Sequence, residues 1–295
     1  MQLTYESFIK IKKSFKNYIK VILSLLFNKK MINVILNDGK TYNWNNIQVR
    51  NYIIAYNMKI KYSKNLELFP DLDKLEMVYN GNKLKFFGFL EDGWIYHEFI
   101  NFEYYNLNFI NQTVIDVGAN SGATSIFFAL NGAKYVYAIE PMPKTYSILK
   151  SNIELNNLDN KIIPLNYGIG KSAIINLDRY ISGQGADINS AITKNGKAIE
   201  IKTLKYIIEN YKLGKCVLKM DCEGCEYDAI LSLDGNDLQH FDEIMMEYHY
   251  GSENLKNFLE GNGFSVTCSN QTNSYNHVSK TKMVSGLLYA KRNNK

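Results

Sequence analysis

Cysteine and proline are both scarce in this chain of 295 residues, which contains four of each. The cysteines, Cys216, Cys222, Cys225 and Cys268, lack the spaced framework of secreted disulfide-rich proteins, so we expect a reducing, cytoplasmic compartment. Scarce proline and the absence of long polar tracts argue against extended disorder. With 46% hydrophobic residues, the chain is able to bury a sizeable core in one large or two modest domains.

The apolar run at residues 21–27, VILSLLF, is too short to cross a bilayer, because a spanning helix needs about 20 apolar residues. The run is followed by Asn28-Lys29-Lys30 rather than by a small-residue cleavage site. We therefore do not expect a secretion signal.

Acidic residues are nearly absent from the first thirty positions, which hold seven lysines and one glutamate. This segment has a local charge of +6, whereas the remainder of the chain has a charge of −1. An enzyme that acts on nucleic acid would more often spread basic side chains around its cleft, so we expect no nucleic-acid partner.

Residues 5–27 have the periodicity of one amphipathic helix, with lysines between apolar residues that recur at steps of three and four. The apolar residues are Phe8, Ile11, Phe15, Tyr18, Ile22 and Leu25. Two roles are open for this helix. It either packs on its own domain or on a second copy of the chain, which we favour, or lies on an anionic membrane surface as a peripheral contact.

Residues 31–108 contain two hairpin signals, Asn37-Asp38-Gly39 and Asn80-Gly81-Asn82, separated by a helix-tolerant stretch at 48–58. We expect three parts: a basic amphipathic helix at 1–30, a small α+β cap at 31–108, and a catalytic domain at 109–295.

The catalytic domain is organised around residues 113–141, TVIDVGANSGATSIFFALNGAKYVYAIEP. A buried strand at 113–117 leads into a turn in which Gly118 and Gly122 let the backbone approach a ligand where a helix begins. A second strand at 135–139 delivers Glu140 to its carboxyl end, where a carboxylate can bind both hydroxyls of a ribose.

The third glycine of the dinucleotide fingerprint is missing from this turn. This absence disfavours a pyrophosphate and a nicotinamide cofactor. It favours a nucleoside ligand without phosphates, of which S-adenosyl-L-methionine is the commonest.

Further strands are predicted at 162–165, 215–220, 243–248, 264–268 and 286–290, with helices between them. Alternating strands and helices predict a doubly wound, mainly parallel, seven-stranded Rossmann-like sheet. A polar loop at 179–195 is either a lid or acceptor-binding loop, or an ordinary connection.

Polar side chains crowd two of these strand ends: Asp221 and Glu223 follow one strand, and Glu247 and His249 follow the next. Ligands of such sheets sit outside the carboxyl ends of the strands, so we expect these four residues to be catalytic. His249 is the preferred general base because the pKa of an ordinary histidine is close to neutrality. Its neighbours Glu247 or Glu223 would orient it or polarise the substrate, and Asp221 would lie nearest the reacting atom of the ligand. A divalent cation on Asp221, Glu223 and His249 is chemically feasible, but we expect a metal-free site.

The segment Cys222-Glu-Gly-Cys225 has the form C-x-x-C. A second pair of zinc ligands and a thioredoxin-like context are both absent from the sequence, so we expect two small buried side chains rather than thiol chemistry.

The strings VIDVGANSG, AIEPMP, LKMDCEGCEYDAI and MEYH, in this order, resemble the FkbM family of S-adenosyl-L-methionine-dependent methyltransferases over about residues 85–268. The resemblance implies methyl transfer to a hydroxyl oxygen, with a sugar, glycan or related small molecule as acceptor. It also implies that Glu140 holds the ribose, that Asn166 lies beside the adenine, and that the turn holds the methionine end. The cofactor-binding positions are then Asp116, Gly118, Ala119, Asn120, Gly122, Glu140, Pro141 and Asn166. Two other functions are weighed against this one: a nucleoside-binding protein without activity, and a nicotinamide-dependent oxidoreductase.

Overall fold

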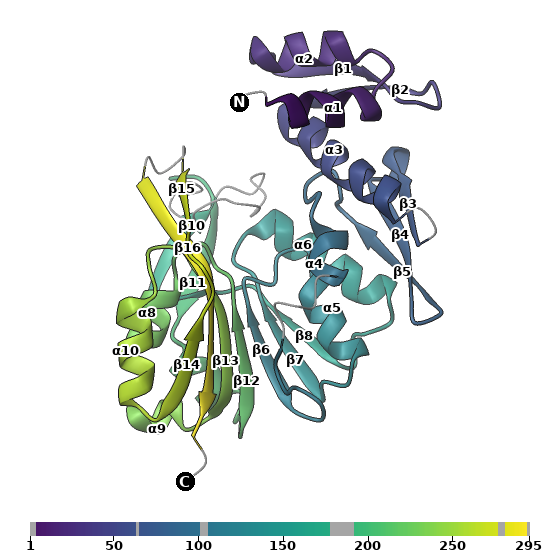
Figure 1. The fold of residues 1–295 in the computed structure, drawn as a ribbon. Coiled ribbons are helices and arrows are strands. Elements are labelled where there is room, and N and C mark those ends of the chain that lie inside the picture. Colours follow the sequence, from purple (N-terminus) through teal and green to yellow (C-terminus); the bar gives the residue numbers. More distant parts are fainter. Residues whose placement is uncertain (1–3, 63–64, 101–105, 178–191, 277–280, 294–295) are drawn as a thin grey trace. The chain divides into compact units, whose positions relative to one another are not determined.

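The structure, a computed structural model, describes residues 4–62, 65–100, 106–177, 192–276 and 281–293. The chain forms two compact units, Met1–Ile100 and Asn101–Lys295 (Figure 1). The predicted loop at 179–195 lies largely outside the described residues.

The first unit is built from two small antiparallel sheets and four α-helices among its described residues. Its elements are α1 (Tyr5–Ser14), α2 (Tyr18–Leu26), β1 (Met31–Ile35), β2 (Thr41–Asn45), α3 (Asn46–Lys61), β3 (Leu66–Phe69), β4 (Lys74–Tyr79), β5 (Asn82–Phe87) and α4 (Ile95–Ile100). Both predicted hairpins are confirmed, β1 with β2 and β4 with β5. Asn80 and Gly81 have φ angles of 48° and 77°, the left-handed values that a tight hairpin turn requires.

The prediction of one helix over residues 5–27 is wrong, because α1 and α2 are separated by Phe15–Asn17. Phe15 is extended, buried and bridged to Leu36 in antiparallel fashion. Asn17 accepts a hydrogen bond from the Ile35 backbone N–H at 2.8 Å and donates one to Asn33. The chain leaves the helix here because this short segment pairs with the edge of β1, a contact that helical periodicity does not encode.

The second unit contains the predicted sheet. Its elements are β6 (Thr113–Val117), α5 (Ala123–Leu130), β7 (Tyr135–Ile139), α6 (Pro143–Leu155), β8 (Ile162–Leu165), β9 (Gly168–Ile169), β10 (Ala173–Leu177), β11 (Lys197–Lys202), α7 (Leu204–Asn210), β12 (Cys216–Met220), α8 (Glu226–Leu231), α9 (Gly235–Leu238), β13 (Phe241–Tyr248), α10 (Glu253–Gly261), β14 (Phe264–Cys268), β15 (Thr272–Asn276) and β16 (Thr281–Arg292).

The main sheet has the strand order β14-β16-β13-β12-β6-β7-β8, with β15 paired to β16. Strands β13, β12, β6, β7 and β8 are parallel, and β16 is antiparallel to both of its neighbours in this order. The order reverses between β6 and β12, so the sheet is doubly wound and the predicted fold class is confirmed. The small sheet β10-β11-β9 and the pairing of β15 with β16 were not predicted.

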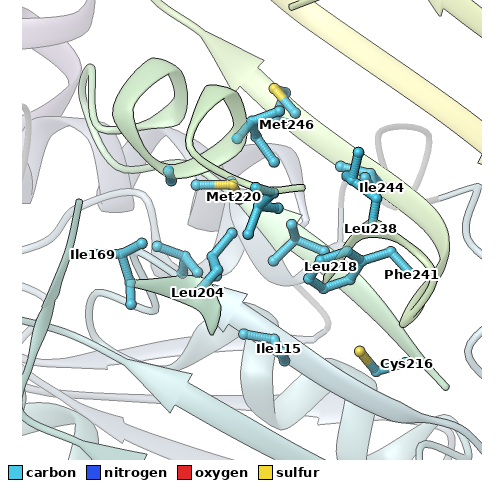
Figure 2. Packing of buried hydrophobic residues seen from close by; sticks show 14 of the residues in the cluster. Ile115, Ile169, Leu204, Cys216, Leu218, Met220, Leu238, Phe241, Ile244 and Met246 are labelled. Atoms are coloured by element: carbon cyan, nitrogen blue, oxygen red, sulfur yellow. The ribbon is translucent and has the colours of Figure 1, made fainter. Parts of the chain in front are cut away.

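One large cluster of buried side chains in this unit lies on the sheet face that is covered by α7, α8, α9 and α10. Side chains of β6, β12 and β13 meet those of the helices there; Ile115, Leu218, Ile244 and Leu204 are fully buried (Figure 2). Burying such side chains contributes about 1.5–3 kcal/mol each. This packing fixes the carboxyl ends of β6, β12 and β13 relative to one another.

Candidate active site

The turn after β6 comes into direct contact with the end of β12. Gly118 has a φ angle of 76°, and a Cβ atom built on it would lie 1.7 Å from the backbone oxygen of Asp221. Asp221 in turn donates its N–H to Val117 at 2.9 Å. A glycine is required at position 118 because no side chain fits between these two strand ends.

Asp116 is fully buried beneath this turn. Its Oδ2 accepts hydrogen bonds from Thr124 at 2.7 Å and Ser125 at 2.6 Å, and its Oδ1 lies 2.9 Å from the Lys219 Nζ. Lys219, itself buried, also donates to the Gly118 carbonyl at 3.3 Å. These contacts tie the turn to α5 and β12, and the predicted contact of Asp116 with the methionine end stays a prediction.

Glu140 lies at the carboxyl end of β7, where it is 4% exposed. Its Oε2 accepts the Asn120 backbone N–H at 3.1 Å and its Oε1 accepts that of Met142 at 2.8 Å. Burial raises the pKa of Glu140 to about 7, although the two N–H groups act in the opposite direction. Each carboxylate oxygen keeps a second lone-pair direction, which a ligand hydroxyl can use.

Other predicted cofactor positions lie near this carboxylate, and some of them form hydrogen bonds with backbone groups at the end of β7. Buried Ala119 donates its N–H to Ile139 at 3.0 Å. The Asn166 Nδ2 donates to the carbonyls of Glu140 and Pro141 at 2.9 and 3.1 Å, and its Oδ1 accepts from Lys197. Gly122 starts α5 with a φ angle of 93°. The structure thus gathers these positions at adjacent strand ends.

His249 is the centre of the second predicted group and is 3% exposed. Its Nδ1 lies 3.1 Å from the Glu226 Oε1, and its Nε2 lies 3.4 Å from the Glu223 Oε2 and 3.9 Å from the Asp221 Oδ1. One imidazole thereby contacts three carboxylates.

The pKa of His249 is the product of two opposed effects. Burial lowers it, but the hydrogen bond with Glu226 and the charges of Glu226, Glu223 and Asp221 raise it to about 9. The neighbouring carboxylates thus move the pKa of His249 away from the near-neutral value on which its choice as the base was founded, and its role as a base stays a prediction.

For two carboxyl groups beside His249, burial raises the pKa and the nearby positive charges lower it. Burial and the neighbouring Asp221 raise the pKa of Glu247 to about 7, although His249 and Lys219 oppose the shift. Partial burial likewise raises the pKa of Asp221, whose side chain is 42% exposed, against the charges of Lys219 and His249. Glu247 is thus poised to exchange a proton near neutral pH.

Two buried residues of this site were missed from the sequence. Glu226, fully buried at the start of α8, accepts the Cys222 backbone N–H at 3.2 Å besides contacting His249. Lys219 lies inside the otherwise apolar strand CVLKM. The sequence did contain signals for both residues: a lysine within a buried strand, and a third acidic residue in DCEGCE. Buried charges require partners of opposite charge, so each of these residues pointed to a contact within the site.

Cys222 and Cys225 form a disulfide with a Cα–Cα distance of 5.5 Å, so the prediction of two small, unreactive side chains is wrong. The loop between them turns through Glu223 and Gly224, which have φ angles of 57° and 116°. This turn brings the two cysteines together and aims Glu223 toward His249.

Strand order places all of these groups along one edge of the sheet. The strands that end at Glu140, Gly118, Asp221 and Glu247 are β7, β6, β12 and β13, which are consecutive neighbours. At about 4.8 Å per strand, the ends of β7 and β12 are about 10 Å apart. They flank the point where the strand order reverses, which is where open α/β sheets bind ligands. Among the residues that the structure describes, no three His, Cys, Asp or Glu side chains are arranged to hold a metal ion.

Two curated methyltransferases are similar to parts of this chain. The tRNA (guanine(37)-N(1))-methyltransferase Trm5b of Methanocaldococcus jannaschii is 33% identical over 137 residues, which are 42% of this chain and 37% of the relative. The ribosomal protein L11 methyltransferase of Carboxydothermus hydrogenoformans is 39% identical over 51 residues, 17% of each chain. The chain therefore spans little more than a third of the first relative and far less of the second.

Solved structures with similar folds include M. jannaschii Trm5 in complex with adenosine, at 16% identity and a TM-score of 0.42, covering 96% of this chain and 79% of that one. A putative RNA methyltransferase from Pyrococcus horikoshii matches at 14% identity and a TM-score of 0.37, covering 68% and 82%.

The model of the methyltransferase FkbM domain matches residues 116–275, more than half of the chain. This match begins at Asp116 and includes Glu140, Asp221 and His249. The chain belongs to the FkbM methyltransferase family.

Proposed function

We propose that this protein transfers the methyl group of S-adenosyl-L-methionine to a hydroxyl oxygen of a sugar, glycan or related small molecule. The observation that carries the proposal is the alignment, on one sheet edge, of the Glu140 carboxylate with an acid and histidine group that contains a near-neutral carboxyl, Glu247.

The family and the fold indicate S-adenosyl-L-methionine as the cofactor, and the side chains at the end of β7 fit it. Glu140 accepts one backbone N–H on each oxygen, which leaves acceptor capacity for two vicinal hydroxyls of a ribose. Gly118, Asn120 and Gly122 all have positive φ angles, so the backbone of the turn is shaped for close approach. Asp116 and Lys219 hold this turn from beneath.

When bound, the cofactor supplies an electrophilic methyl group on a sulfonium centre. The chain has to align the acceptor oxygen and remove its proton, because an unactivated hydroxyl has a high pKa. Positioning supplies much of the rate, and a general base adds about 10²–10⁴-fold.

Glu247 is the general base in this proposal. A base is most effective when its pKa lies near the working pH, and burial raises the pKa of Glu247 to about 7. His249, held as a cation by Glu226, stays protonated and offsets the negative charge of Asp221 and Glu223. Asp221, whose side chain is 42% exposed, is then positioned to accept a hydrogen bond from the acceptor.

The test uses the full chain with methyl-labelled cofactor and a cell extract divided into glycan, glycolipid, small-molecule and RNA fractions. Mass spectrometry should locate the label on an oxygen, as a methyl ether stable to nuclease. Calorimetric titration with S-adenosyl-L-methionine, S-adenosylhomocysteine and NAD separates the other two functions. If the adenosyl ligands bind but no fraction contains a labelled product, the chain is a binding protein without activity. Tight binding of NAD would instead indicate an oxidoreductase.

A second candidate acceptor is an RNA base, favoured by the 33% identity to a tRNA methyltransferase over 137 residues. Label that is released by ribonuclease and found on a ring nitrogen would replace the hydroxyl acceptor with this one.

A further inference from the structure

Helix α2 of the first unit is apolar on two opposite sides. Val21 and Leu25 are buried, and the opposite side carries Ile19, Leu23 and Leu26, which are 61%, 48% and 55% exposed. Phe27, directly after the helix, is 75% exposed. The spacing of 19, 23, 26 and 27 follows one side of a helix, so these four residues form a continuous strip, here called the outer strip.

A helix on the surface of a soluble protein normally turns polar residues outward, and a helix that is apolar all round is normally covered. Phe8 on α1 is a further exposed apolar side chain of this unit; it is 40% exposed, and its ring contacts that of Tyr18, the first residue of α2, edge-on at 6.0 Å. Contiguous exposed apolar surface of this kind marks a site of interaction.

The charge around the outer strip identifies the partner. Residues 10–30 contain seven lysines and no acidic residue. All seven side chains are exposed, at positions 10, 12, 13, 16, 20, 29 and 30. Lys20 lies one turn before Leu23, and Lys29 and Lys30 follow Phe27 directly.

We propose that α2 lies in the surface of an anionic lipid bilayer, with the outer strip inserted among the acyl chains and the lysines at the headgroups. Apolar residues beside lysines are what an interfacial helix requires. RNA phosphates would use the lysines but leave four large apolar side chains in water. A second copy would bring two strongly positive faces together, which repel.

The proposal does not depend on the identity of the methyl acceptor. Among the described residues, no helix is long and apolar enough to cross a bilayer.

The test is sedimentation of the full chain with phosphatidylcholine vesicles that do or do not contain phosphatidylglycerol, at low and high salt. We expect binding to the anionic vesicles alone and its loss at high salt. The variant L23D/F27D should reduce binding by about tenfold or more, because it places charges in the apolar layer. The matched control I47D/L72D makes the same change of charge at side chains that are 52% and 58% exposed elsewhere in the same unit, and should bind like the parent chain.

Three results would overturn the proposal. The first is that the parent chain does not bind anionic vesicles, or that L23D/F27D and I47D/L72D lose vesicle binding to the same extent. The second is a lower melting temperature of L23D/F27D than of I47D/L72D, which would show that the outer strip is covered within the chain. The third is a dimer that L23D/F27D converts to a monomer without any vesicle binding.

Discussion

At the scale of single residues, the site is a set of charged groups whose protonation depends on their neighbours. His249 and Glu247 are two residues apart on the chain, and the pKa values of both are raised, to about 9 and about 7, by different causes. The imidazole gains three carboxylate contacts, whereas Glu247 is half-buried near other negative charges. In the proposed mechanism, His249 therefore stays protonated and Glu247 accepts the proton.

Replacing Glu247 by Gln should lower kcat by about 10²–10⁴-fold while binding of S-adenosylhomocysteine stays unchanged, because the amide cannot take the proton. In the parent enzyme, kcat/KM should rise as pH increases through about 7 and then level, since Glu247 is active when ionised. The same change at exposed Glu253, E253Q, is the control. Full activity of E247Q would contradict the assignment.

Replacing Glu140 by Ala should weaken S-adenosyl-L-methionine binding by about 10–100-fold, the effect of losing hydrogen bonds to a charged group. Calorimetric titration measures the Kd. The control is E154A, an exposed glutamate on α6 that should bind cofactor normally. Equal affinity of E140A and E154A would exclude Glu140 from the ribose site.

Glu226 is a positioning residue, since its Oε1 contacts His249 and its side chain is fully buried. The variant E226Q should lower the pKa of His249 from about 9 toward its ordinary value, because the hydrogen bond with a charge is the largest effect that raises it. NMR titration of the ring protons measures this shift, which a purely structural role of Glu226 would leave unchanged. Glu260, exposed on α10, provides the control E260Q.

At the scale of elements, the site depends on how closely the ends of β6 and β12 approach. The parallel register of Val117 with Met220 places the turn at Gly118 against the backbone of Asp221. The Cys222–Cys225 disulfide then closes the loop between β12 and α8 and orders the backbone that carries Glu223.

The variant G118A should destabilise the second unit by more than about 2 kcal/mol, because its Cβ atom would meet the Asp221 oxygen and its φ angle is positive. Denaturant unfolding measures the change. G214A is the matched control, since a Cβ atom there has no neighbour within 4 Å and Gly214 has no positive φ angle. If both variants unfold alike, the strand ends are less tightly packed than the structure indicates.

At the scale of the whole molecule, the raised pKa values of buried groups determine how stability responds to pH. A carboxyl such as Glu140, raised from 4.5 to about 7, binds more protons in the folded state between these values, so stability falls as pH rises through that window. His249, raised from 6.5 to about 9, contributes stability that is complete below pH 6.5 and is lost as pH rises through 9.

Both effects have the same sign, so the melting temperature of the cofactor-free protein should fall steadily from about pH 5 to pH 9. Calorimetric scans across this range test the expectation, and E226Q should flatten the upper part of the curve. A stability maximum near pH 8 would contradict it.

The fold was predictable because its signals are local. Buried strands such as 113–117 are short runs rich in β-branched residues, and the Asn80-Gly81 turn requires left-handed backbone, so each element is specified by its own residues. The break at Phe15–Asn17 was not predictable, since it depends on pairing with a strand edge twenty residues away. The disulfide was also missed, because the loop geometry that brings Cys222 to Cys225 is set by the packing of β12 and α8.

The doubly wound sheet, the family and the identity of the residues at the strand ends follow from the amino-acid sequence, because hydrophobic periodicity, turn chemistry and motif spacing are properties of neighbouring residues. The direction in which the pKa values of those residues shift, and the buried groups that contact them, Lys219 and Glu226, follow from the packing of the folded chain. The reason is physical: a pKa depends on desolvation and on charges within a few ångströms, and those distances are set when β12, β13 and α8 pack together.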